Sequence, residues 1–203
     1  DGRRAARYGE RAALVRASFL RFFWDPCDRV LADSLAPGAR GEGLPEYRVR
    51  PNQLDALLAS GLIADAPMAR AVLRAVRREL VSPFGLYTLC PDDPRFHPRL
   101  AEEGLYGPDS ALDNGPIDAR LTAAYVAALA QGAFRRTGRR CVLATLDARR
   151  GEIYVGRYGL APDGRCVAAL APDALCAPEV LEPGLPAADW LATGTGWQAY
   201  RDT

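Results

Sequence analysis

Apolar residues in the first part of the chain recur at the spacing of an amphipathic helix. Over residues 4–23 they follow one another at steps of four and three positions, which places them on one face. These apolar positions are Tyr8, Ala12, Val15, Phe19 and Phe22. The pair Asp25-Pro26 then ends the pattern, because a residue before proline is driven out of the helical region. The sequence therefore predicts a long first helix with one apolar stripe.

Three more helices follow from the same reasoning. They are expected over residues 51–60, 67–80 and 116–136. Gly61 and Gly138 stand just past the ends of the first and third, where glycine is favoured, and either Asp65 or Ala66 stands near the cap of the second. Residues 37–43 are rich in glycine and are predicted to be a loop. Residues 82–116 are rich in proline and are predicted to be an irregular connection.

The periodicity changes from helical to alternating after the fourth helix. Short apolar or alternating runs, typical of strands, occupy residues 142–146, 153–158, 166–170 and 190–193. The first two runs are joined by a turn that contains Gly151, which predicts a hairpin. The sequence thus predicts an α+β fold: a helical domain over residues 1–122 and an α/β domain over residues 123–203.

Composition narrows the chemistry that the chain can perform. All 26 basic residues are arginine, which excludes Schiff-base lysine chemistry and a P-loop lysine. The formal net charge of +1 gives no field to attract nucleic acid, so no direct nucleic-acid binding is expected. The five cysteines form no CxxC pair; we expect no metal site, no cofactor and a cytoplasmic protein with reduced thiols. No apolar run approaches the roughly 20 residues of a membrane helix.

Three ordered motifs carry a resemblance to a known family. They are residues 50–53 (Arg-Pro-Asn-Gln), 82–89 (Ser-Pro-Phe-Gly-Leu-Tyr-Thr-Leu) and 91–94 (Pro-Asp-Asp-Pro). Over roughly residues 8–122 the chain resembles the C-terminal domain of glycogen debranching enzymes. The resemblance implies part of an α/α ring of helices, an amylo-α-1,6-glucosidase activity and an α-glucan as the ligand.

The family resemblance indicates a set of substrate-binding candidates. They are Trp24, Arg50, Asn52, Asp92, Asp93 and Asn114. Glycoside hydrolysis needs two carboxyl groups that flank the scissile bond. The carboxylates beside proline can instead be turn and cap residues, so no catalytic residue is assigned. Residues 112–120 keep the family's Asn-Gly-Pro centre but lack its histidine and tryptophans, which puts hydrolysis by this chain in doubt.

The end of the chain resembles a second family. The motifs are residues 130–135 (Ala-Gln-Gly-Ala-Phe-Arg), 142–154 and 193–200, and the likeness to TsaB proteins begins at about residue 127. The resemblance implies part of an ASKHA-type α/β fold. It also implies a non-catalytic role beside a TsaD-type partner in the formation of threonylcarbamoyladenosine in tRNA. Arg150 departs from the methionine that is common in that family.

Six residues in these last motifs are candidates for a partner surface or for a structural turn. They are Asp147, Arg149, Glu152, Gly194, Gly196 and Trp197. The carboxylates can simply satisfy the backbone of the hairpin turn. The two glycines let backbone N–H groups approach phosphate, but a tight turn is the favoured interpretation.

Three hypotheses of function follow. The chain is a non-catalytic TsaB-like subunit fragment joined to a degenerate debranching-like segment, or it is a glycoside hydrolase remnant that acts on or binds α-glucan. The third hypothesis is a chimeric chain with no native activity. A chimera predicts that the helical part and the sheet-forming part do not bury one another, so that Phe19, Val76 and Leu146 do not share an interior.

Overall fold

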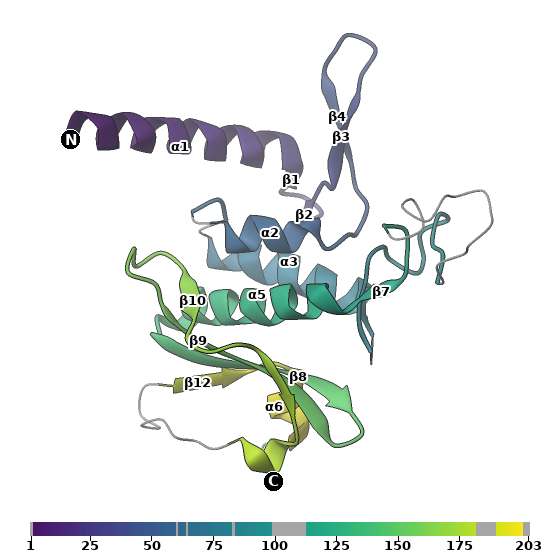
Figure 1. Ribbon diagram of the computed structural model, residues 1–203. Helices are drawn as coiled ribbons and strands as arrows, with labels where there is room; N and C mark the ends of the chain where they lie inside the picture. Colours follow the sequence, from purple (N-terminus) through teal and green to yellow (C-terminus); the bar gives the residue numbers. More distant parts are fainter. Residues whose placement is uncertain are drawn as a thin grey trace.

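The longer helices lie in the first two-thirds of the chain, among short strands, and the main sheet follows them, as Figure 1 shows. The computed structural model describes residues 2–59, 61–63, 65–82, 84–98, 113–181 and 190–200. The helices are α1 (Gly2–Phe23), α2 (Asn52–Leu58), α3 (Ala66–Glu79), α5 (Ala119–Thr137) and α6 (Thr195–Tyr200), with a 3₁₀ turn at Pro178–Val180. The predicted α+β class is confirmed. Closure of α2, α3 and α5 into part of an α/α ring stays a prediction.

Short strands accompany the helices and longer ones build the sheet. The short strands are β1 (Trp24–Asp25), β2 (Val30–Leu31), β3 (Ser34–Pro37), β4 (Gly43–Glu46), β5 (Val81–Ser82), β6 (Gly85–Tyr87) and β7 (Ile117–Asp118). The sheet strands are β8 (Cys141–Arg149), β9 (Glu152–Leu160), β10 (Val167–Ala169), β11 (Ala174–Cys176) and β12 (Trp190–Thr193). The predicted loop over residues 37–43 is the tip of the β3–β4 hairpin, whose flanking strands the sequence pattern did not reveal.

Two predicted helix ends are confirmed by their caps, whereas α2 ends at Leu58 with Ala59 as its C-cap, before the predicted stop at Gly61. The Asp65 carboxylate accepts a hydrogen bond from the backbone N–H of Met68 at 2.7 Å and so begins α3. Gly138 adopts a left-handed conformation, with φ of 68°, and ends α5. These local signals work because a cap is formed by residues that are neighbours in the sequence.

The sheet is built around the predicted β8–β9 hairpin. Its order is β10-β9-β8-β12, with β11 also paired to β9. β8 and β9 are antiparallel, whereas β12 runs parallel to β8. At the hairpin turn Arg150 and Gly151 have φ of 55° and 78°, the positive values that a type I′ turn needs. α6 packs against β8 and β12.

Helix α5 lies between α2 and α3 on one side and the sheet on the other (Figure 1). One cluster of buried side chains includes Val76 of α3, Tyr125 of α5 and Leu146 of β8, and Phe19 of α1 packs against it. The helices therefore bury part of the sheet's apolar face. The expectation that the two parts do not bury one another is wrong for the described residues. The division of the chain into two domains near residue 122 stays a prediction.

Helix α1 projects from the rest of the molecule (Figure 1). Its C-terminal end is anchored, because Phe19 and Phe23 pack on the core and stack on each other with ring centroids 5.0 Å apart. Tyr8 and Val15 on the predicted stripe are exposed, at 60% and 62%. The amphipathic pattern thus predicted the helix correctly, but Phe19 is the one residue of its stripe that packs against the core of the described chain, and Phe22 is 45% exposed. No described helix is long and apolar enough to cross a bilayer.

Candidate functional site

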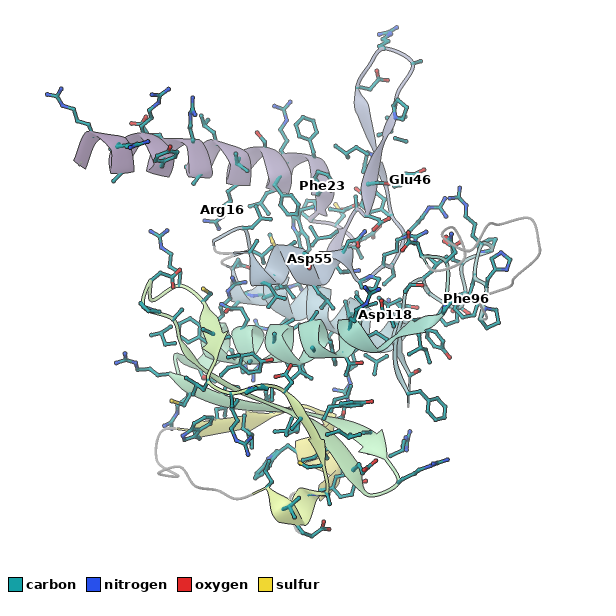
Figure 2. All side chains as sticks on the ribbon, viewed as in Figure 1. Arg16, Phe23, Glu46, Asp55, Phe96 and Asp118 are labelled. Atoms are coloured by element: carbon teal, nitrogen blue, oxygen red, sulfur yellow. The ribbon has the colours of Figure 1, made fainter. Side chains whose placement is uncertain are left out.

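A polar cavity of about 450 Å³ lies where the base of the β3–β4 hairpin, the start of α2 and the start of α5 meet. Figure 2 labels Glu46 and Asp118, which come to this side of the molecule from the hairpin and from α5. The other charged or amide-bearing lining residues are Asp33, Arg48, Arg50, Asn52, Arg95 and Asp113. None of the described lining residues is aromatic.

Arg50 is the centre of the hydrogen-bond network in this cavity. Its Nε lies 3.3 Å from Oδ2 of Asp33, and its Nη2 donates to Oδ1 of Asn114 at 2.8 Å. Its Nη1 donates to the carbonyl oxygen of Asp113. Asn52 donates from Nδ2 to Oδ1 of Asp33 at 2.9 Å. One guanidinium therefore ties together three segments that are far apart in the sequence.

A second cavity of about 410 Å³ shares Glu46, Arg48 and Arg95 with the first. In it Arg48 donates from Nη1 to Oδ2 of Asp93 at 3.2 Å, and its Nε lies 3.9 Å from Oε2 of Glu46. Ser34 donates from Oγ to the same Glu46 oxygen at 3.0 Å. Alternating arginines and carboxylates thus form a continuous polar surface across the two cavities.

The environment shifts the titration of two carboxyl groups at the cavity. Burial raises the pKa of Asp33 above its usual range, and the Arg50 charge and the Asn52 hydrogen bond offset that rise in part. The hydrogen bond from Arg120 lowers the pKa of Asp118, whose carboxylate also accepts from the backbone N–H of Arg120 at 2.9 Å and so caps α5. Asp118 is thereby engaged in helix capping, while Asp33 lines the cavity and keeps lone pairs that its contacts with Arg50 and Asn52 do not use.

The structure brings together some of the substrate-binding candidates and separates others. Arg50 and Asn52 line the cavity, and Asn114 joins it through Arg50. Asp93 lines the adjoining cavity. Asp33, Glu46 and Arg48 were missed, because their sequence neighbours carry no motif and only the fold places them beside Arg50. The binding roles of all these residues stay predictions.

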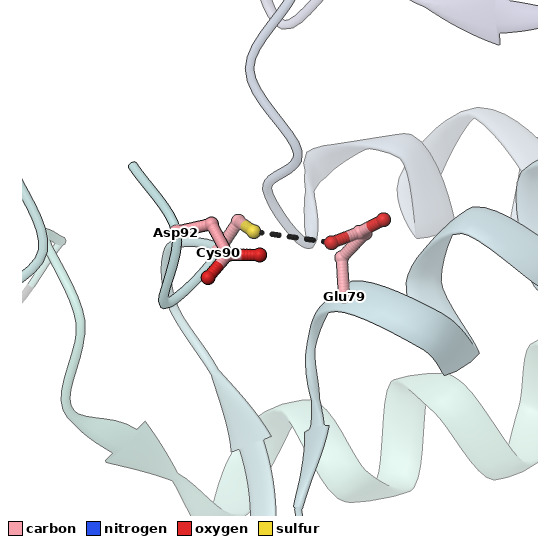
Figure 3. A group of neighbouring side chains, drawn as sticks. All are labelled: Glu79, Cys90 and Asp92. Atoms are coloured by element: carbon pink, nitrogen blue, oxygen red, sulfur yellow. Dashed lines mark hydrogen bonds between the residues drawn. The ribbon is translucent and has the colours of Figure 1, made fainter. Parts of the chain in front are cut away.

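Trp24 and Asp92 lie outside the lining of both cavities. Trp24 forms β1 and packs against the core cluster. Asp92 lies beside Glu79 and Cys90, with one ligand-type atom of each within 4.8 Å of the others (Figure 3). The Cys90 thiol donates to Oε2 of Glu79 at 3.3 Å, and burial raises the thiol's pKa. A protonated thiol hydrogen-bonded to a carboxylate accounts for this cluster, and the expectation of a chain without a metal site stays a prediction.

The candidates near the end of the chain form a second cluster, where β8 meets the start of α6. The backbone N–H of Asp147 donates to Oγ1 of Thr195 at 3.0 Å, and that of Trp197 donates to Oγ1 of Thr145 at 2.6 Å. The Asp147 carboxylate accepts from the backbone N–H of Arg149 at 2.9 Å. Asp147 therefore does satisfy the turn backbone, as the structural alternative expects, and Glu152 is exposed at the first position of β9.

The two glycines of this cluster are required by close packing. A Cβ on Gly194, whose φ is 105°, would lie 1.8 Å from the carbonyl oxygen of Thr145. A Cβ on Gly196 would lie 3.0 Å from side-chain atoms of Thr145 and Ile153. This geometry supports the tight-turn interpretation of both glycines. Trp197 beside them is 43% exposed.

Comparison with known proteins finds both resemblances, each over part of the chain. A family described as Amylo-alpha-1,6-glucosidase matches residues 2–152. The tRNA threonylcarbamoyladenosine biosynthesis protein TsaB of Escherichia coli (strain K12) is 37% identical over 76 residues, which are 36% of this chain and 32% of that protein. The chain thus spans about a third of the length of that relative.

Two solved structures from Pseudomonas aeruginosa are also similar in sequence. YeaZ is 38% identical and covers 37% of this chain and 35% of its own, with a TM-score of 0.34. An uncharacterized protein with similarity to peptidase YeaZ is 37% identical, with the same coverage and TM-score. At this TM-score the superposition carries no structural argument, so the likeness is one of sequence.

Proposed function

The chain belongs to the amylo-alpha-1,6-glucosidase family through residues 2–152, and from this premise we propose that the cavity beside Arg50 binds a glucosyl unit of an α-glucan. The observation that carries the proposal is the convergence of Asp33, Arg50 and Asn52 on one cavity. Sugar hydroxyls both donate and accept hydrogen bonds, and carboxylate, amide and guanidinium groups complement them.

Asp33 is the central acceptor in this proposal. An ionised carboxylate offers about four lone-pair positions. Arg50 and Asn52 occupy one position on each of its oxygens, at 3.3 and 2.9 Å, and hold the group still. The remaining positions can accept from two neighbouring hydroxyls of a glucosyl ring.

Binding rather than hydrolysis is the role that we propose for this chain. Hydrolysis needs a second carboxyl group, free to act across the scissile bond from the first. Asp118 is engaged by Arg120 and by the backbone of α5, and Glu46 accepts from Ser34 and lies beside Arg48. The family's histidine and tryptophans have no counterpart in residues 112–120. Stacking and proton donation by those groups are therefore missing from this segment.

Calorimetric titration with panose, which carries an α-1,6 linkage, tests the proposal. Asn52 is exposed, so Asn52→Ala should fold normally, and we expect it to weaken binding about tenfold by removing the donor that orients Asp33. Asp55→Asn is the matched control, since Asp55 is exposed on α2 and does not line the cavity (Figure 2). No heat of binding at millimolar panose would contradict the proposal. Release of glucose that is lost in Asp33→Asn would contradict its binding-only form.

The 37% identity to TsaB favours a second candidate function. We propose that the region from about residue 127 pairs with a TsaD-type protein and has a non-catalytic role in threonylcarbamoyladenosine modification of tRNA. The exposed Trp197 beside the β8–α6 cluster supports this, because aromatic side chains are enriched at protein interfaces. Trp197→Ala should abolish capture of a TsaD-type partner, whereas Leu175→Ala, at an equally exposed site on β11, should not.

Failure of both tests would leave a chain without native activity, although the shared core argues against the separate packing that a chimera predicts. The five cysteines are all free. Free thiols are typical of reducing compartments, which supports a cytoplasmic location as part of the proposal.

A further inference from the structure

A cavity of about 700 Å³ separates the middle of α1 from the body of the molecule. Its remaining lining comes from the segment just after α2, from the last turns of α5 and from Arg165 of the β9–β10 connection. Apolar lining is provided by Val15, Leu62 and Phe134. The size falls within the range of small-molecule sites. It shares no lining residue with the cavities beside Arg50.

Three arginines from three different elements line this cavity: Arg16 of α1, Arg135 of α5 and Arg165. Figure 2 shows Arg16 on the side of α1 that faces the body. No aspartate or glutamate is among the described residues that line it. Guanidinium groups keep their charge at all physiological pH values, so the cavity concentrates positive charge beside an apolar wall.

Two of these guanidinium groups have buried nitrogen atoms without a partner. Nε of Arg16 and Nη1 of Arg135 are hidden from solvent and have no hydrogen-bond acceptor among the described residues. Burial lowers the pKa of Arg135, and the nearby Arg16 charge adds to that effect. Buried charged donors are normally paired, because a buried donor without an acceptor loses its hydration and gains no hydrogen bond in return.

The neighbouring arginine shows that this arrangement is specific to the cavity. Arg136 follows Arg135 in the sequence but is exposed and does not line the cavity. A solvated pair would leave both side chains in water. Here Arg135 instead lies on the face of α5 that lines the cavity, together with Phe134 and near Arg16.

We propose that this cavity binds an organic oxyanion, a phosphate or carboxylate group carried on an apolar body. The oxyanion bridges Arg16 and Arg135, whose buried N–H groups donate to its oxygens. The apolar body packs against Val15, Leu62 and Phe134. Bidentate pairing of arginine with phosphate or carboxylate is among the strongest hydrogen-bonded contacts in proteins. The bound molecule also joins α1 to the body, which the projecting helix otherwise contacts mainly through its last turns.

Calorimetric titration of the full chain with 1-naphthyl phosphate tests the site. We expect saturable binding, weakened at least about tenfold in both Arg16→Gln and Arg135→Gln and unchanged within about twofold in Arg136→Gln. The uncharged 1-naphthol should bind at least about tenfold more weakly, since it lacks the oxyanion. Inorganic phosphate should bind more weakly than the naphthyl ester and lose binding in the same variants.

Equal affinity in Arg135→Gln and Arg136→Gln would overturn the proposal, as would the absence of saturation at millimolar 1-naphthyl phosphate. Equal affinity for 1-naphthol would overturn it as well. Thermal unfolding without ligand gives an independent result. Removal of one of two neighbouring like charges, each with a buried and unpaired nitrogen atom, should leave Arg16→Gln at least as stable as the parent chain. A lowered melting temperature would show that Arg16 has a purely structural role instead.

Discussion

The buried side chain of Gln131 in α5 accepts a hydrogen bond from the backbone N–H of Val167 in β10 at 2.8 Å. Its Nε2 donates in turn to the carbonyl oxygen of Arg165 at 3.3 Å. Gln131 lies within the segment that matches the amylo-alpha-1,6-glucosidase family, and Val167 lies beyond it. A single amide thus fastens the central helix to an edge strand of the sheet.

Replacement of this amide by an apolar group of similar length should destabilise the protein. In Gln131→Met the Val167 N–H and the Arg165 carbonyl lose their partner, at a cost of about 1–3 kcal/mol in the free energy of unfolding. Urea denaturation followed by circular dichroism measures this. Gln198→Met, at an exposed position of α6, should change stability by less than about 0.5 kcal/mol. Equal effects of the two changes would contradict the role given to Gln131.

The shared core predicts that helices and sheet unfold together. Leu57 of α2 and Leu146 of β8 are 0% and 3% exposed and belong to the same cluster. Leu57→Ala and Leu146→Ala should each cost about 2–5 kcal/mol. Each should shift the far-ultraviolet circular dichroism and tryptophan fluorescence transitions by the same amount. Separate shifts of the two signals would show that the halves unfold independently. Leu175→Ala, at a site 50% exposed, is the control and should shift neither transition appreciably.

Gly194 and Gly164 allow conformational strain and steric overlap to be separated. Both have positive φ, but a Cβ on Gly194 meets the Thr145 carbonyl oxygen at 1.8 Å, whereas a Cβ on Gly164 meets nothing within 4 Å. Gly164→Ala should cost about 1–2 kcal/mol from the left-handed backbone alone. Gly194→Ala should cost about 1–3 kcal/mol more, because the backbone must move. Thermal unfolding of the two variants gives the comparison, and equal losses would contradict it.

The hairpin turn offers a stabilising substitution. Arg150 occupies the first position of a type I′ turn with φ of 55°, and Gly151 follows it. Asn-Gly is the preferred pair for this turn, because asparagine tolerates a positive φ better than most residues. Arg150→Asn should therefore raise stability by about 0.5–1 kcal/mol. Arg40→Asn, in an exposed turn where φ is not positive, should have no effect in the same melting experiment.

Asp33 and Asp118 should titrate on opposite sides of the usual aspartate pKa. Burial raises the pKa of Asp33, so the folded state holds that proton longer than the unfolded chain does. The contribution of Asp33 to stability therefore falls as pH rises from 3.8, the unfolded value, through the folded value. Asp118 behaves oppositely: its lowered pKa contributes stability above 3.8 that is lost as pH falls through the folded value.

Carboxyl-carbon NMR titration distinguishes these two groups. Arg50→Gln should raise the pKa of Asp33 further, because the Arg50 charge now lowers it. Arg120→Gln should return Asp118 toward its ordinary pKa, because the Arg120 hydrogen bond is the largest cause of its shift. An Asp33 pKa that does not respond to Arg50→Gln would contradict the ion pair on which the proposed α-glucan site depends.

The sequence by itself determined the elements whose signals are local. Helical periodicity, the Asp65 and Gly138 caps and the Gly151 turn involve residues within a few positions of one another, and the structure contains each of them. Motif order also singled out Arg50 and Asn52, which line the polar cavity. Backbone preferences of this kind are fixed by neighbouring side chains and do not depend on the rest of the fold.

Only the tertiary structure decided which distant residues meet. Arg50 reaches Asn114 across 64 positions, and Asp33 joins them without any motif of its own. Arg135 comes near Arg16 only because the fold places α1 and α5 on two sides of one cavity. The same helical pattern left Tyr8 exposed and buried Val76, because burial depends on a partner surface that periodicity cannot supply. Long-range packing therefore determined both the polar cavity and the arginine-lined one.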